Sequence, residues 1–129
     1  MNTTEAKTND CLLDSFSETF NILDATIDKL KIYLEKDGLI IEVYMKLLYP
    51  RGVNFKLRFC RVKEYYFYWN EKYTFYNIRS YKFFKTNNLF YISFDPYDEE
   101  EIISQNDGDF ILCEKIEGIF LALHDETSK

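Results

Sequence analysis

Hydrophobic and polar residues alternate with a period of two along residues 29–35, 39–47 and 53–59. In each segment the apolar side chains fall on one face of an extended chain, as in a strand whose other face meets water. These apolar positions are Leu30, Ile32, Leu34, Leu39, Ile41, Val43, Met45, Leu47, Val53, Phe55, Leu57 and Phe59. Asp37-Gly38 and Pro50-Arg51-Gly52 separate the segments and predict tight turns between antiparallel strands.

The following segment, residues 64–85, carries aromatic side chains on both faces, with short polar interruptions. Two-sided apolar strands are expected where a sheet is covered on both sides or meets a partner. Asn87-Asn88 predicts another hairpin, and Asn106-Asp107-Gly108 predicts a turn into the last long strand or strands. Residues 11–23 allow one short helix of impure period. The patterns predict an all-β, mostly antiparallel fold, a sandwich or barrel-like sheet of about seven to nine strands.

The chain has 129 residues, of which 47% are hydrophobic, which suits one domain with a sizeable core. We expect this domain to span residues 11–123, between a disordered polar tail at 1–10 and a C-terminal tail at 124–129. The first residues lack the basic start and apolar run of a signal peptide. No stretch approaches the roughly 18 apolar residues that a membrane helix needs. These features favour a cytoplasmic protein without a membrane anchor.

The residues that most often carry catalysis are few. Cys11, Cys60 and Cys113 are odd in number and lack metal-ligand spacing, and the last two lie in apolar runs typical of a core. His124 can pair with Asp125 as an acid–base couple, although a solvated tail is the favoured interpretation. There is no Gly-rich phosphate loop and no G-x-S-x-G element. The sequence therefore predicts no enzyme and no cofactor.

The stretch FYISFDPYDEEE, residues 90–101, turns from a strand-like run into a cluster of carboxylates. Asp95-Pro96 ends the strand, because proline cannot donate to the sheet and aspartate favours turns. Calcium would need several of these oxygens, but their spacing does not match the D-x-D-x-D-G pattern of calcium loops, so we predict no metal site. The carboxylates considered as calcium ligands are Asp95, Asp98, Glu100, Asp107 and Asp109.

Charge is segregated along the chain, although the formal net charge is −6. Residues 50–92 hold nine Lys or Arg and two Asp or Glu, whereas residues 93–129 hold two and eleven. The acidic surplus suits a surface that docks a basic protein, and a surface that only promotes solubility remains open. We predict a non-enzymatic protein-binding module whose contacts are Tyr97, Asp98, Glu99, Glu100, Glu101, Asp107 and Asp109. Reversing Glu99, Glu100 and Asp107 to lysine is then expected to leave the fold intact.

The basic middle segment supports an alternative function. Cations interleaved with aromatic rings are the combination that binds single-stranded RNA or DNA. The alternative nucleic-acid contacts are Arg58, Arg61, Lys63, Arg79 and Lys82. No RNP1-like Gly-Phe-x-Phe element accompanies them, and basic strands neutralised by neighbouring acidic strands are the simpler interpretation.

The segment SYKFFKTNNLFYISFDPYDEEE, followed by NDGDFI, resembles a run found in short uncharacterised bacterial proteins. This resemblance covers about the C-terminal half of the chain and implies a bacterial, intracellular protein with no known reaction or cofactor. In size and charge the chain also resembles immunity proteins that neutralise secreted toxins. That second resemblance implies a basic toxin domain as the protein partner.

Overall fold

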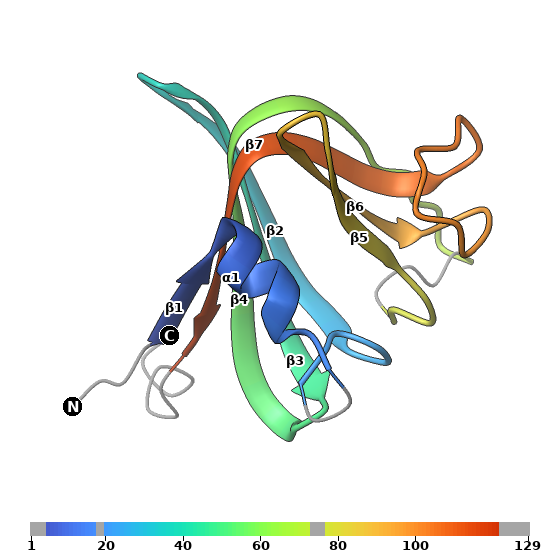
Figure 1. The fold of residues 1–129 in the computed structure, drawn as a ribbon. Coiled ribbons are helices and arrows are strands. Elements are labelled where there is room, and N and C mark those ends of the chain that lie inside the picture. Colours follow the sequence, from blue (N-terminus) through green and yellow to red (C-terminus); the bar gives the residue numbers. More distant parts are fainter. Residues whose placement is uncertain (1–4, 18–19, 73–76, 122–129) are drawn as a thin grey trace.

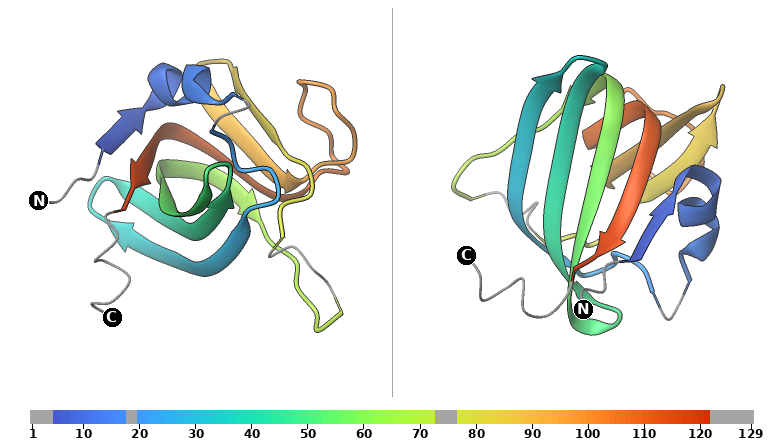
Figure 2. Two further views of the ribbon diagram at one scale, coloured as in Figure 1. Left: turned by 90° about the horizontal axis from the view of Figure 1, so that it is seen from below. Right: turned by 90° about the vertical axis from the view of Figure 1, so that its left-hand side faces the viewer.

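The structure is a computed structural model that describes residues 5–17, 20–72 and 77–121. Its elements in chain order are β1 (Glu5–Thr8), α1 (Asn9–Ser15), β2 (Thr26–Glu35), β3 (Gly38–Leu48), β4 (Arg51–Tyr66), β5 (Lys82–Thr86), β6 (Leu89–Asp95) and β7 (Gly108–Phe120). The seven strands form one antiparallel sheet in the order β2-β3-β4-β7-β6-β5, and β1 pairs with the end of β7. The predicted all-β, antiparallel fold is confirmed. Over the described residues the sheet curves strongly but does not close into a barrel (Figure 1, Figure 2).

The curved sheet encloses the hydrophobic core on its concave side, and α1 lies across one end of it (Figure 2). Most of the alternating residues of β3 and β4 predicted to share a face are buried: Ile41, Val43, Met45, Leu47, Phe55, Leu57 and Phe59. Leu39 and Val53, near the starts of these strands, are half-buried. The expectation is wrong for Ile32 and Leu34, which are 43% and 76% exposed. They lie on the edge strand β2, in the hairpin whose tip extends beyond the rest of the sheet (Figure 1).

The predicted turns lie at the junctions between strands, although Arg51 and Gly52 already belong to β4. Asn87 and Asn88 have φ values of 50° and 65°, the left-handed backbone that a two-residue hairpin requires, and they join β5 to β6. The segment 64–85 is not one strand, because β4 ends at Tyr66 and β5 begins at Lys82. Aromatic side chains at the end of β4 and just after it are exposed: Tyr65, Tyr66, Tyr68 and Trp69.

The predicted N-terminal tail is wrong for residues 5–10. Residues 5–8 form β1, which pairs with residues 117–120 of β7, and α1 begins at Asn9. The side chain of Asn9 accepts a hydrogen bond from the N–H of Ile116 at 3.0 Å, and Leu12 is buried against the sheet. The helix is shorter than the segment 11–23, because the backbone is already extended at Phe16. The predicted C-terminal tail, 124–129, lies outside the described residues.

No helix in the described part of the chain is long and apolar enough to span a bilayer.

Candidate protein-binding groove

The acidic loop, residues 96–107, connects β6 to β7 and is anchored by Asp107. The carboxylate of Asp107 is buried and accepts hydrogen bonds from the Tyr91 hydroxyl at 2.7 Å and from the N–H groups of Tyr97 and Ser104 at 2.9 and 3.0 Å. Tyr91 belongs to β6, so these contacts tie both ends of the loop to the sheet. The loop therefore has a fixed position over β5 and β6.

Lys82 of β5 completes this anchor. Its side chain is 2% exposed, and its Nζ lies 3.0 Å from Asp107 Oδ1 and 2.8 Å from Asp98 Oδ1. The same Nζ donates a hydrogen bond to the carbonyl of Ile102 at 2.9 Å. A buried ammonium is tolerated only when it is paired in this way.

The pKa values of the three charged groups follow from this geometry. Burial would raise the pKa of Asp107, but its hydrogen bonds from Tyr97, Tyr91, Ser104 and Lys82 outweigh burial and lower the pKa. The hydrogen bond from Lys82 lowers the pKa of Asp98. Burial would lower the pKa of Lys82, and its two carboxylate partners raise it instead. All three groups are therefore charged at neutral pH, and the anchor persists.

Five of the seven predicted partner contacts lie on the acidic loop outside the interior. Glu99, Glu100 and Glu101 are exposed, Tyr97 is 66% exposed, and Asp98 is partly buried by its ion pair with Lys82. The expectation of a surface position is wrong for Asp107 and Asp109, which are 4% and 0% exposed. Asp107 holds the loop, and the carboxylate of Asp109 accepts the Tyr68 N–H at 2.9 Å. Reversal of Asp107 would consequently disturb the fold.

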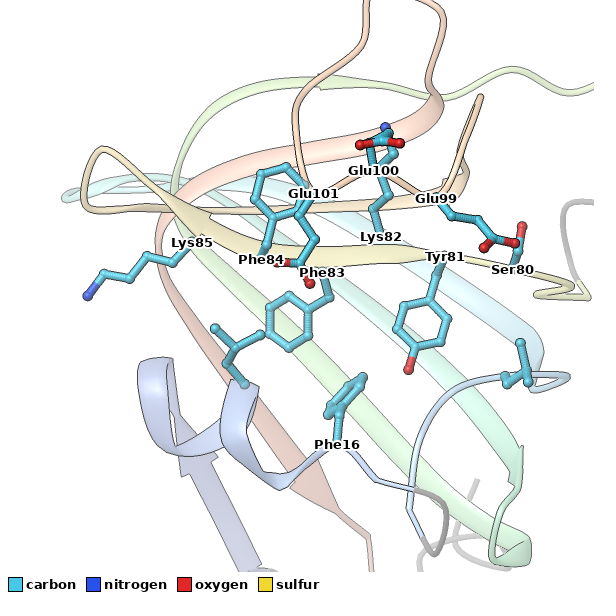
Figure 3. Close-up of a pocket in the computed structure, with 12 residues that line it drawn as sticks. Phe16, Ser80, Tyr81, Lys82, Phe83, Phe84, Lys85, Glu99, Glu100 and Glu101 are labelled. Carbon is cyan, nitrogen blue, oxygen red and sulfur yellow. The ribbon is translucent and has the colours of Figure 1, made fainter.

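A groove of about 730 Å³, called the edge groove below, lies beside the three exposed glutamates. Figure 3 shows β5 running between Phe16, which directly follows α1, and the loop that carries Glu99, Glu100 and Glu101. Phe16 packs edge-on against Phe83 of β5, with ring centroids 5.0 Å apart. The groove is lined by Leu13, Phe16, Leu23, Ser80, Tyr81, Lys82, Phe83, Phe84, Lys85, Glu99, Glu100 and Glu101. It thus has an apolar wall on one side and an acidic rim on the other.

Most cations of the alternative nucleic-acid site are engaged by carboxylates. Lys82 is buried in the loop anchor, and Arg61 Nε and Lys63 Nζ each lie 2.7 Å from Glu114. Arg58 forms ion pairs with Glu35, Glu42 and Glu117 on the convex face of the sheet. Arg79 is exposed on the segment before β5. The ion pairs agree with the interpretation that acidic neighbours neutralise the basic strands.

The convex face also holds a buried carboxylate that the sequence analysis missed. Glu42 is 6% exposed and accepts hydrogen bonds from the hydroxyls of Tyr33 and Tyr44 at 3.0 and 2.9 Å. Burial would raise the pKa of Glu42, but these hydroxyls and the nearby Lys56 and Arg58 lower it. Glu42 lies on the polar face of an alternating strand, so the local pattern predicts an exposed side chain. The tyrosines that cover it come from two strands, β2 and β3, and their contact with Glu42 depends on how these strands pair.

The other residues considered for catalysis or metal binding are the cysteines, His124 and the carboxylates. Cys60 and Cys113 are buried core residues as predicted, and burial raises the pKa of both thiols, that of Cys113 to about 12. Neither is a thiolate at neutral pH. His124 and Asp125 lie outside the described residues. Across residues 5–17, 20–72 and 77–121, no three His, Cys, Asp or Glu side chains gather as a metal site would require.

Comparisons with protein-family models, curated proteins and solved structures return no match.

Proposed function

We propose that this chain is a non-enzymatic protein-binding module that holds a basic segment of a partner protein in the edge groove. The observation that carries the proposal is the pairing of an apolar wall with an acidic rim whose position is fixed by Asp107 and Lys82. Apolar contacts supply affinity, and the glutamates accelerate and select the encounter with a cationic partner. Because the rim is preorganised, binding does not have to pay for ordering the loop.

The proposal extends the resemblance to immunity proteins. A secreted toxin that attacks nucleic acid needs a basic cleft, and such a cleft offers the cationic surface that the acidic rim would bind. We place the protein, as part of the same proposal, in the bacterial cytoplasm. The nucleic-acid alternative is less well supported, since the ammonium of Lys82 is buried and Arg58, Arg61 and Lys63 are paired with carboxylates.

Selection from a display library of random peptides tests the proposal without knowledge of the partner. We expect the selected peptides to be enriched in Lys, Arg and apolar residues, and their binding to weaken as salt is raised. A variant with Glu99→Lys, Glu100→Lys and Glu101→Lys should lose at least about tenfold in affinity, because rim charges govern encounter with a cationic ligand. Its melting temperature should stay near that of the wild type, since exposed substitutions have small effects on stability.

The matched control carries the same change of charge elsewhere on the surface. Asp28, Glu64 and Glu71 are exposed and do not line the edge groove, so their reversal to lysine should leave peptide binding nearly unchanged. Selected peptides that are acidic or uncharged would overturn the proposal. An equal loss of binding in the control variant would also overturn it, because the effect would then come from net charge alone.

A further inference from the structure

The floor of the edge groove is the free edge of a β-sheet. β5 is the last strand of the sheet order and pairs with β6 alone among the described residues. In a two-residue hairpin the closing pair, here Thr86 and Leu89, exchanges hydrogen bonds, and such pairs recur at every second residue. Lys82 and Phe84 therefore bond to β6, whereas the N–H and C=O groups of Phe83 and Lys85 point toward the groove. A strand edge of this kind is a template for another extended chain.

The groove is apolar on the side that meets the concave face of the sheet and acidic on the side that meets the opposite face. Leu13 of α1 and Phe16, which directly follows the helix, lie on the concave side of β5, where Phe83 also points into the core. The acidic loop lies on the other side, over Lys82 and Tyr91. Successive side chains of a strand point to opposite faces. A strand added to β5 would therefore direct alternate residues toward α1 and toward Glu99–Glu101.

We propose that a partner binds by adding an extended segment to the free edge of β5, with apolar and basic residues in alternation. This inference rests on the proposed function and names the binding mode and the sequence class of the partner. The apolar residues contact Leu13 and Phe16, the Lys or Arg residues meet the acidic rim, and the backbone pairs with Phe83 and Lys85. The mode is β-strand addition, in which main-chain hydrogen bonds give affinity and alternate side chains give specificity.

A second copy of this chain is a poorer occupant of the same edge. Two β5 strands side by side would bring two sets of Glu99, Glu100 and Glu101 together, and like charges at an interface are unfavourable. Lys85 does not relieve this repulsion, because its Nζ is already 3.2 Å from Asp10 of α1. The charge of the rim therefore selects a basic partner over self-association.

Two synthetic peptides of equal composition test the binding mode. Each is about seven residues long, enough to span a typical strand; one alternates Lys and Val, and the other groups its Lys residues at one end. We expect the alternating peptide to bind at least about tenfold more tightly in a fluorescence anisotropy titration. On binding, hydrogen exchange of the Phe83 and Lys85 amides should slow, while the Lys82 and Phe84 amides, already bonded to β6, change little.

A change to the backbone separates strand addition from charge attraction. Lys85→Pro removes an N–H that faces the groove without removing a bond to β6, and edge strands tolerate proline. It should abolish binding of the alternating peptide, whereas Lys85→Ala should retain it. If Lys85→Pro does not fold, the same test can be made on the peptide. Methylation of every second backbone nitrogen of the Lys–Val peptide removes N–H groups that would bond to β5. In one of the two possible methylation registers its affinity should fall about tenfold, the equivalent of one or two lost hydrogen bonds.

The outcomes distinguish this inference from the proposed function. Equal affinity for the two peptides, with no protection of Phe83 and Lys85, overturns strand addition while the basic-partner function stands. Absence of binding by either peptide at low salt overturns both. Tight binding of the alternating peptide with both amides protected supports both.

Discussion

Replacement of Asp107 by alanine should be one of the most damaging single changes to this fold. The substitution removes the acceptor for the Tyr91 hydroxyl and for the N–H groups of Tyr97 and Ser104. It also removes one carboxylate partner of Lys82, whose side chain is 2% exposed. Breaking a buried ion pair by deleting one partner costs about 3–5 kcal/mol.

The size of this loss can be compared with the stability of the whole domain. Folded domains are stable by about 5–15 kcal/mol, so the variant loses a large part of its margin. For a chain of this size the same loss lowers the melting temperature by roughly 10–20 °C. Asp98→Ala should have a smaller effect, because Asp98 is partly exposed and Lys82 keeps Asp107 and the Ile102 carbonyl as partners.

Urea unfolding followed by circular dichroism measures these differences, with Glu100→Ala as the exposed control on the same loop. A double variant, Lys82→Met with Asp107→Leu, should recover part of the loss, because apolar residues can replace a buried ion pair without leaving a charge unpaired. A loss below about 1 kcal/mol in Asp107→Ala, the net worth of one ordinary hydrogen bond, would refute the reasoning. It would mean that Asp107 does not hold the acidic loop.

Three further predictions follow from other contacts. The pKa values of Asp107 and Glu42 are lowered in the folded protein, so their stabilisation is complete above the ordinary carboxylate pKa of about 4 and is lost as the pH falls through the lowered values. Asp107→Asn should flatten this loss of stability in an acid titration, and an unchanged slope would contradict the assignment. Gly118→Ala should lower the free energy of unfolding in urea by about 1–3 kcal/mol. A Cβ at this position would lie 2.5 Å from Leu12 Cδ1 and 2.8 Å from Phe55 Cζ. An unchanged free energy would show that α1 does not pack on β7 as described. Millimolar calcium should leave the melting temperature unchanged, because Asp98 and Asp107 are already paired with Lys82. Calcium at a hundred times the dissociation constant of a real site would stabilise the fold by about 2.7 kcal/mol, which would raise the melting temperature visibly.

Local patterns predicted the strands well, because a strand buried on one face alternates apolar and polar residues over only a few positions. Residues 39–47 and 53–59 alternate as their positions in β3 and β4 require, and Asn87-Asn88 forms the expected hairpin. The edge strand β2 departs from its pattern, because periodicity does not show where the core ends. Strand β1 was missed since a polar segment of four residues carries no periodic signal.

The candidate site depended on contacts between distant parts of the chain. Lys82 and Asp107 are 25 residues apart, and the charge pattern along the chain assigns Lys82 to a basic segment and Asp107 to an acidic surface. In the folded protein they neutralise each other and hold the loop. The acidic rim could be predicted from the run of glutamates, but the groove could not, because α1 and β5 meet only through the curvature of the sheet.

The most direct test of the central claim is an NMR titration of the isotope-labelled protein with the alternating Lys–Val peptide. The account predicts that the largest shift changes fall on residues 80–85 and 99–101, which line the edge groove, and on Leu13 and Phe16 at the end of α1. Changes spread over all acidic surfaces, or centred on the exposed aromatics Tyr65 to Trp69 with the groove unaffected, would contradict it.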